Sequence, residues 1–312
     1  MQLRRSTLSK HTDSHRGERE EVGHSLDEPS SGTGLGADGR RTPPGTFQSA
    51  STSHCQGIEI DGLRHEYVDQ YSGEIVLAID DLNLQMPACE FLTIVGPSGC
   101  GKSTMLNIVG GLVKPTKGTI TVDENPVHGP GRDRGMVFQE FAILPWRTVE
   151  SNIGHPLEIM GVDKAERRER VGDLIRLVNL EGFERKYPHE LSGGMKQRVA
   201  VARALAQDPA VLLMDEPFAA VDAQTRITLQ EELLQIADRT RKSVLFITHS
   251  VDEAVLLGHR VAVVSRRPGR VKATVDIPFA LGDRSVELLV KDERYRELRD
   301  EVLDLVRAEV DS

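Results

Sequence analysis

The chain has 312 residues, enough for one large domain or two modest ones with a substantial core. Its hydrophobic fraction of 38% and charged fraction of 28% are those of an ordinary globular protein. The formal net charge of −9 argues against the basic surface that binds nucleic acid regardless of sequence, so we expect no nucleic-acid partner. No apolar run reaches the ~18–20 residues that cross a bilayer. Collagen, a coiled coil and an integral membrane protein are therefore excluded.

The first expected region is a disordered N-terminal tail, residues 1–56. It balances seven basic against seven acidic residues and holds few large apolar side chains. Such a stretch cannot bury enough apolar surface to offset its ordering entropy. Arg4 and Arg5 are not followed by an apolar run, so the start does not resemble a secretory signal.

Three cysteines, Cys55, Cys89 and Cys100, are too few for a disulfide scaffold and show no C-x-x-C spacing. We expect Cys55 and Cys89 to be unpaired thiols, which fits a reducing compartment.

The next segments alternate between strand and helix patterns. Ile58–Ile60 and residues 76–86 alternate apolar and polar side chains, which indicates antiparallel strands. Strongly apolar runs at 91–95, 211–214 and 244–247 are typical of strands buried on both faces. Helical patterns are expected at 167–178, 192–206 and 223–238. This alternation predicts an α/β fold with a parallel sheet.

A phosphate-binding loop follows the first buried strand. Residues 96–104 match G-x-x-x-x-G-K-[ST] between the 91–95 strand and a helix through Met105–Val109. Glycines allow the tight turn that aims backbone N–H groups at a phosphate, and the helix adds its positive end. Lys102 is expected on the β and γ phosphates, and Ser103 on Mg²⁺. The predicted nucleotide-binding residues of the loop are Gly96, Pro97, Ser98, Gly99, Cys100, Gly101, Lys102, Ser103 and Thr104.

Two acidic residues end the 211–214 strand, in the arrangement called Walker B. Asp215 is expected to hold Mg²⁺ together with Ser103. Glu216 stands one residue further on and is predicted to polarise the attacking water.

A third motif identifies the family. The run from Leu191 to Arg198 contains Ser192-Gly193-Gly194 and resembles the LSGGQ signature of ABC-type ATPases, with Met195 in the last position. Physically, these three residues form a second anion-binding nest at a helix N-terminus.

Further ABC landmarks follow the expected order. The resemblance implies that Gln139 approaches the metal and the water, that Asp222 belongs to the D-loop, and that His249 contacts the γ-phosphate. It also implies an aromatic residue stacked on adenine. Tyr67 is the prediction, and Tyr71 is its rival.

Smaller features resemble the nitrate, sulfonate and taurine branch of ABC importers: Phe138-Gln139-Glu140, Leu144-Pro145-Trp146, Thr148-Val149 and residues 265–270. Trp146 is interpreted either as core packing or as part of the surface that receives the permease. Cys89 departs from the glycine of many members, so a positive φ there would be strained.

The resemblance implies three regions. Residues 57–281 form the ABC ATP-binding domain, a P-loop NTPase core with an antiparallel β subdomain and a helical insertion at about 144–206. Residues 282–312 form a C-terminal helical extension, and its apolar spacing favours packing on its own domain.

The function so implied is ATP hydrolysis that drives solute import, with ATP and Mg²⁺ as cofactors. The solute is expected to be nitrate, a sulfonate, taurine or a related small anion. Partners would be a second copy of the chain, integral membrane permease subunits and, indirectly, an extracytoplasmic solute-binding protein. The chain would lie peripherally on the cytoplasmic face of the membrane. The alternatives are another ABC transporter branch, or a non-transport ABC ATPase of repair or translation.

Overall fold

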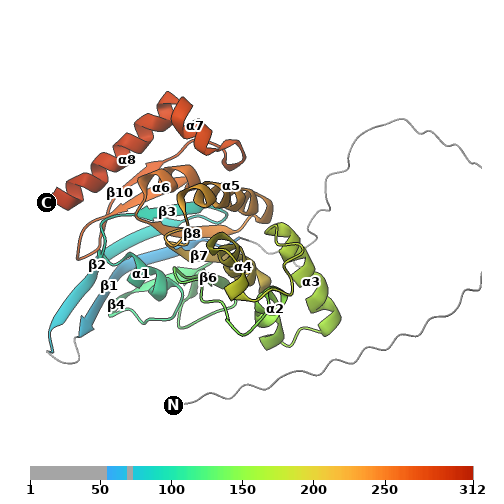
Figure 1. Cartoon of the computed structure of the whole chain (residues 1–312). Helices are drawn as coiled ribbons and strands as arrows, with labels where there is room; N and C mark the ends of the chain where they lie inside the picture. Colours follow the sequence, from blue (N-terminus) through green and yellow to red (C-terminus); the bar gives the residue numbers. More distant parts are fainter. Residues whose placement is uncertain (1–54, 69–72, 312) are drawn as a thin grey trace, which may run out of the picture. The chain divides into compact units, whose positions relative to one another are not determined.

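The computed structural model describes residues 55–68 and 73–311. The predicted tail, apart from Cys55 and Gln56, lies outside these residues, as does Tyr71. The described part contains two β-sheets and the helices that cover them (Figure 1). None of the helices in these ranges is both long and apolar enough to span a bilayer.

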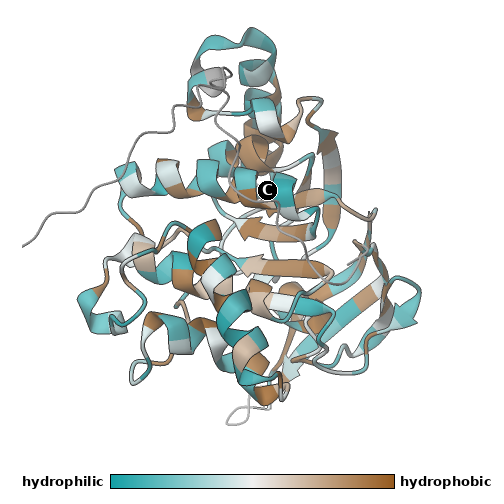
Figure 2. Ribbon diagram, turned by 90° about the vertical axis from the view of Figure 1, so that its right-hand side faces the viewer, coloured by the Kyte–Doolittle hydropathy of each residue, from teal (hydrophilic) through white to brown (hydrophobic). Residues whose placement is uncertain are grey.

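The larger sheet has six strands in the order β10-β9-β3-β8-β7-β6. Neighbours from β9 to β6 pair in parallel, and only β10 is antiparallel. Every residue of β3, β7 and β8 is buried, as expected for strands covered on both faces, and Figure 2 shows apolar residues along the central strands. The strands are β3 (Phe91–Val95), β6 (Arg134–Val137), β7 (Val211–Asp215), β8 (Ser243–Thr248), β9 (Arg260–Val264) and β10 (Val271–Asp276).

The smaller sheet has four strands in the order β2-β1-β4-β5, all antiparallel. Buried and exposed residues alternate at the start of β1, because only one face of this sheet covers the core. The predicted antiparallel subdomain is thus present. Its strands are β1 (Ile58–Val68), β2 (Ile75–Met86), β4 (Lys117–Val122) and β5 (Asn125–Pro126).

Three helices pack on the larger sheet, and two of them start at side-chain caps. Asp222 accepts a hydrogen bond from Thr225 N at the start of α5, and Ser250 caps α6 in the same way. Helix α1 instead begins inside the phosphate loop, after Gly101. The three helices are α1 (Lys102–Val109), α5 (Ala223–Thr240) and α6 (Val251–Leu257).

The predicted helical insertion contains three α-helices that share one apolar cluster with the larger sheet. Ile153 and Leu157 of α2 are fully buried, and Leu174 of α3 packs in the same cluster. The elements are α2 (Val149–Ile159), α3 (Lys164–Leu177), the 3₁₀ turn η1 (Pro188–Glu190) and α4 (Gly193–Ala206).

The C-terminal extension packs on its own domain, as its apolar spacing predicts. Tyr295 and Val302 of α8 are fully buried against a valine-rich cluster that includes Val95. Arg284 is also buried, and its guanidinium donates to carbonyl groups at the end of α6 and after β10. Burial lowers the pKa of Arg284 to about 10. The elements are η2 (Leu281–Asp283), α7 (Val286–Lys291) and α8 (Glu293–Asp311).

The prediction that Cys55 and Cys89 are unpaired thiols is wrong. They form a disulfide with a Cα–Cα distance of 5.1 Å, within the usual range. Cys89 N donates to Ser243 Oγ at 2.8 Å, and that hydroxyl donates to Gln56 O at 2.7 Å. Cys89 has φ of 61°, so the conformation anticipated for this turn is present. Cys55 and Gln56 therefore contact the folded domain, and the end of the expected tail moves to residue 54.

Removing residues 1–54 should leave the melting temperature and ATP hydrolysis unchanged, because that stretch lacks the apolar residues needed to join the core. Removing residues 1–56 should lower the melting temperature by about 5–10 °C, since it also removes a disulfide that closes a loop of tens of residues. Differential scanning calorimetry under oxidising conditions measures both. Adding a reductant to the protein that lacks residues 1–54 should lower its melting temperature by most of the same amount. Lower activity of the protein lacking residues 1–54 would contradict this boundary.

Candidate nucleotide-binding site

The predicted phosphate loop joins the carboxyl end of β3 to α1, as the sequence implies. Gly99 and Gly101 have φ of 74° and 101°, a conformation that few other residues adopt. A β-carbon on Gly101 would also lie 2.8 Å from Ala78 O of strand β2. These glycines let the loop fold tightly between the two sheets.

Lys102 occupies the centre of the loop. Its side chain is buried, and Nζ donates to Gly96 O at 2.8 Å and to Pro97 O at 2.9 Å. Cys100 Sγ lies 3.7 Å from the same nitrogen. The ammonium is therefore fixed where a phosphate bound to the loop would meet it.

Ser103 and Asp215 come together from α1 and the end of β7. Ser103 Oγ donates to Asp215 Oδ1 at 2.9 Å. Burial raises the pKa of Asp215 above its usual value and the neighbouring Glu216 adds to this, whereas the Ser103 hydroxyl and Lys102 oppose it. A hydroxyl and a carboxylate are oxygen donors of the kind Mg²⁺ prefers, and a divalent cation would favour the ionised Asp215. Ser103 and Asp215, two of the three predicted metal ligands, therefore suit the ion.

Glu216 and His249 meet beside the loop. His249 Nδ1 and Glu216 Oε2 are 3.0 Å apart, and Glu216 lines the same pocket as Lys102. Glu216 has φ of 42°, which is uncommon for a residue with a side chain. Its N–H donates to Ile247 O at 3.0 Å and so extends the pairing of β7 with β8.

Tyr67 also lines this pocket, which has a volume of about 220 Å³. Its hydroxyl is 3.1 Å from Thr104 Oγ1, and its ring meets His65 edge-on at 4.6 Å. Tyr67 is 44% exposed, and an exposed aromatic side chain offers a surface on which a base can stack. Tyr67 thus lines the pocket that contains Lys102, and its stacking on adenine stays a prediction. Its rival Tyr71 lies outside the described residues.

The signature and D-loop residues lie together but at a different place. Ser192 caps α4 by accepting from Met195 N at 3.3 Å, and a β-carbon on Gly194 would meet Thr225 Cγ2 at 2.5 Å. A β-carbon on Gly193 would lie 3.5 Å from the carbonyl oxygen of Ala220, which stands two residues before Asp222. The pocket of Tyr67 and Lys102 is lined instead by β1, β2, the phosphate loop, Glu216 and Arg267. Ser192, Gly193, Gly194 and Asp222 therefore do not join the nucleotide pocket of their own chain.

Gln139 is a further predicted site residue that lies outside this pocket. It follows β6 in a turn, is exposed, and is not among the residues that line the pocket. Its role beside the metal stays a prediction.

Sequence reasoning missed three residues of the pocket, which are Val76 and Ala78 of β2 and Arg267. Arg267 lies between β9 and β10 and donates from Nε and Nη2 to Gly99 O at 3.2 and 3.1 Å. In the sequence, residues 265–270 stand out only as a feature of the importer branch. An arginine that far along the chain carries no motif that links it to the phosphate loop.

Known proteins share this arrangement. Residues 79–219 match the family model described as ABC transporter. The chain is 51% identical over 243 residues to an uncharacterised ABC transporter ATP-binding protein of Methanocaldococcus jannaschii, which covers 77% of this chain and 88% of that protein. It is 45% identical over 260 residues to the taurine import ATP-binding protein TauB of Rhizobium johnstonii, and the match covers 81% of this chain and 98% of that protein. A dimeric structure of the ATP-binding cassette MJ0796 bound to ADP and Pi matches with a TM-score of 0.63 at 33% identity. The match covers 71% of this chain and 99% of that chain.

The fold and the site define an ABC ATPase, an enzyme that binds and hydrolyses ATP. The chain belongs to the ATP-binding proteins of ABC transporters. Its similarity to TauB proteins confirms the predicted resemblance to the nitrate, sulfonate and taurine branch.

Replacing Glu216 with Gln should lower ATP hydrolysis by about 10²–10⁴-fold, the usual effect of losing a general base. Binding of ATP should persist, because Lys102, Ser103 and Asp215 remain in place. Phosphate release and equilibrium binding measure the two effects. Glu181→Gln is the matched control, since Glu181 is exposed and lies away from the pocket. Hydrolysis at the wild-type rate would remove Glu216 from this role.

Proposed function

We propose that this protein powers the import of a small anion, such as taurine, another sulfonate or nitrate. The observation that carries this proposal is the 45% identity to a taurine import ATP-binding protein across 98% of that protein's length. The permease and an extracytoplasmic solute-binding protein would select the solute. The ATPase would lie on the cytoplasmic face of the membrane and supply the energy.

Two copies of the chain would form the working ATPase. The signature residues Ser192–Gly194 are separate from the pocket that holds Lys102 in the same chain. A head-to-tail pair would place the signature nest of one copy over the phosphates bound by the other, where the α4 N-terminus favours negative charge. A related cassette, MJ0796, is described as a dimer in two solved structures, which supports this arrangement.

Hydrolysis would then use residues from both copies. Mg²⁺, held by Ser103 and Asp215, would neutralise phosphate charge when bound. Lys102 would hold the terminal phosphates, while Glu216 would accept a proton from the attacking water. His249 would orient the Glu216 carboxylate through its 3.0 Å contact and reach toward the γ-phosphate. Separation of the copies after hydrolysis would complete the cycle.

Trp146 supports a permease-binding surface on the helical insertion. Its side chain is 71% exposed, so the interpretation as core packing is wrong. The buried Asn152 holds its segment rigid by accepting from Leu144 N and donating to the carbonyls of Leu144, Arg147 and Thr148. A fixed and exposed tryptophan is typical of an interface anchor.

Solute uptake by whole cells tests the proposal. The cells should carry Glu216→Gln in place of the natural copy, with Glu181→Gln as the control. Uptake of radiolabelled taurine, ethanesulfonate or nitrate should be lost in the first strain and kept in the second. Unchanged uptake of all three anions, with ATP hydrolysis abolished in the purified variant, would contradict the proposed substrate class and favour another transporter branch or a non-transport role.

A further inference from the structure

Arg267 brings a positive charge to the phosphate loop from a segment outside the matched family residues 79–219. Both Nε and Nη2 donate to the carbonyl oxygen of Gly99, at 3.2 and 3.1 Å. Arg267 also lines the pocket that contains Tyr67 and Lys102. The guanidinium thus contacts the loop at Gly99, whereas the Lys102 ammonium is bonded to the Gly96 and Pro97 carbonyls.

The Gly99 carbonyl matters because its peptide plane also contains the N–H of Cys100. In a planar trans peptide the C=O and N–H bonds point in opposite directions. Fixing the carbonyl on Arg267 therefore fixes the direction of the Cys100 N–H. Gly99 has φ of 74° and lacks a side chain, so this plane would otherwise turn easily. Hydrogen bonds from a charged donor are about twice as strong as neutral ones, which suits them to this task.

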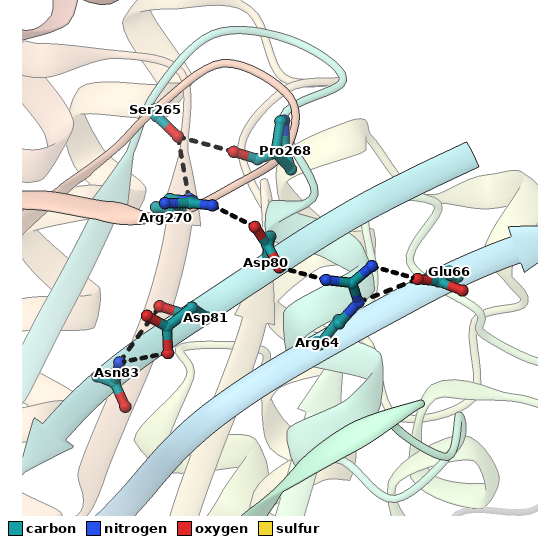
Figure 3. A network of polar contacts seen from close by, with 8 residues as sticks. All are labelled: Arg64, Glu66, Asp80, Asp81, Asn83, Ser265, Pro268 and Arg270. Carbon is teal, nitrogen blue, oxygen red and sulfur yellow. Dashed lines mark hydrogen bonds and ion pairs between the residues drawn. The ribbon is translucent and has the colours of Figure 1, made fainter. Parts of the chain in front are cut away.

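The segment that carries Arg267 is itself held in place (Figure 3). Ser265 Oγ donates to Pro268 O at 2.9 Å and accepts from Arg270 N at 3.0 Å, which closes the turn. The Arg270 side chain pairs with Asp80 of β2, and Gly269 N donates to Ala78 O at 2.9 Å.

Asp80 joins this turn to the smaller sheet. Its other oxygen accepts from Arg64 Nη1 at 2.9 Å, and Arg64 pairs with Glu66 at 2.6 Å. Glu66 precedes Tyr67, which lines the same pocket as Arg267. A continuous chain of ion pairs therefore connects the turn of Arg267 with the strand that carries Tyr67.

We propose that Arg267 is a positioning residue for ATP binding, which holds the Gly99–Cys100 peptide so that its N–H faces the phosphates. Asp80 supports it by holding Arg270 and the turn. The Cys100 N–H held in this way stabilises the bound nucleotide equally in the ground state and the transition state. Loss of Arg267 therefore weakens binding and leaves the chemical step unchanged.

Arg267→Ala tests the first part, with Arg266→Ala as the matched control in the same turn. Arg266 is exposed and is not among the residues that line the pocket. For Arg267→Ala we expect the Kd for ADP and the KM for ATP to rise about 5- to 20-fold. This is at the low end for loss of a charged hydrogen bond, because the Arg267 side chain is exposed and solvent weakens the interaction. The kcat and the melting temperature should stay near wild type, and Arg266→Ala should bind ADP normally.

Arg267→Lys separates positioning from simple charge attraction. A lysine keeps the charge but lacks the planar fork that meets one oxygen with two N–H groups. Positioning therefore predicts that Arg267→Lys recovers only part of the lost affinity. Full recovery would show that attraction of the nucleotide by charge is sufficient and would overturn the proposal. An Arg267→Ala protein with unchanged Kd and KM, or with kcat reduced as strongly as kcat/KM, would also overturn it.

A double-mutant cycle tests the role of Asp80. Asp80→Asn should raise the Kd for ADP, and adding Arg267→Ala should raise it by less than the same change does in the wild-type protein. Fully additive losses would show that Asp80 does not act through Arg267.

Discussion

The structure depends on a single constraint, which is that backbone N–H groups of the phosphate loop must converge on one anion site. The buried Lys102 ammonium holds this loop by binding the carbonyls of Gly96 and Pro97. Those bonds turn carbonyl oxygens toward the lysine and leave N–H groups for the phosphates. Gly99 and Gly101 supply the backbone conformations the turn requires. The loop is thus fixed between a fully buried strand and the helix that follows it.

The remaining parts of the site follow from the parallel sheet. Strands β3, β8 and β7 are neighbours, so the residues after their carboxyl ends meet at one edge. Asp215 reaches Ser103 there, and His249 reaches Glu216, although each pair is far apart in sequence. The smaller sheet adds Tyr67 to the pocket that contains Lys102. The four signature and D-loop residues lie elsewhere, which is why a second copy is needed in the account proposed above.

Much of this arrangement could be predicted because its signals are local. Residue spacing determines the local geometry of two parts of the site. One is the loop around Lys102, and the other is the strand that leads to Asp215 and Glu216. Contacts between distant segments carry no such signal. The Cys55–Cys89 disulfide depends on how β1 enters the smaller sheet, and the Arg267–Gly99 contact depends on the turn after β9. Trp146 was ambiguous because an apolar side chain looks the same in a core and on an interface. The position of Gln139 follows from a turn whose direction its own residues do not specify.

The most direct test of the central claim, that two copies share each ATP site, mixes two defective proteins. Glu216→Gln has an intact signature, and Ser192→Arg has an intact Glu216. Each alone should hydrolyse ATP very slowly, because both sites of either homodimer lack one part. Mixed before ATP is added, they should recover up to roughly a quarter of the wild-type rate, since half of randomly formed dimers are mixed and each holds one intact site. A rate equal to the sum of the two separate proteins would contradict sites shared between copies.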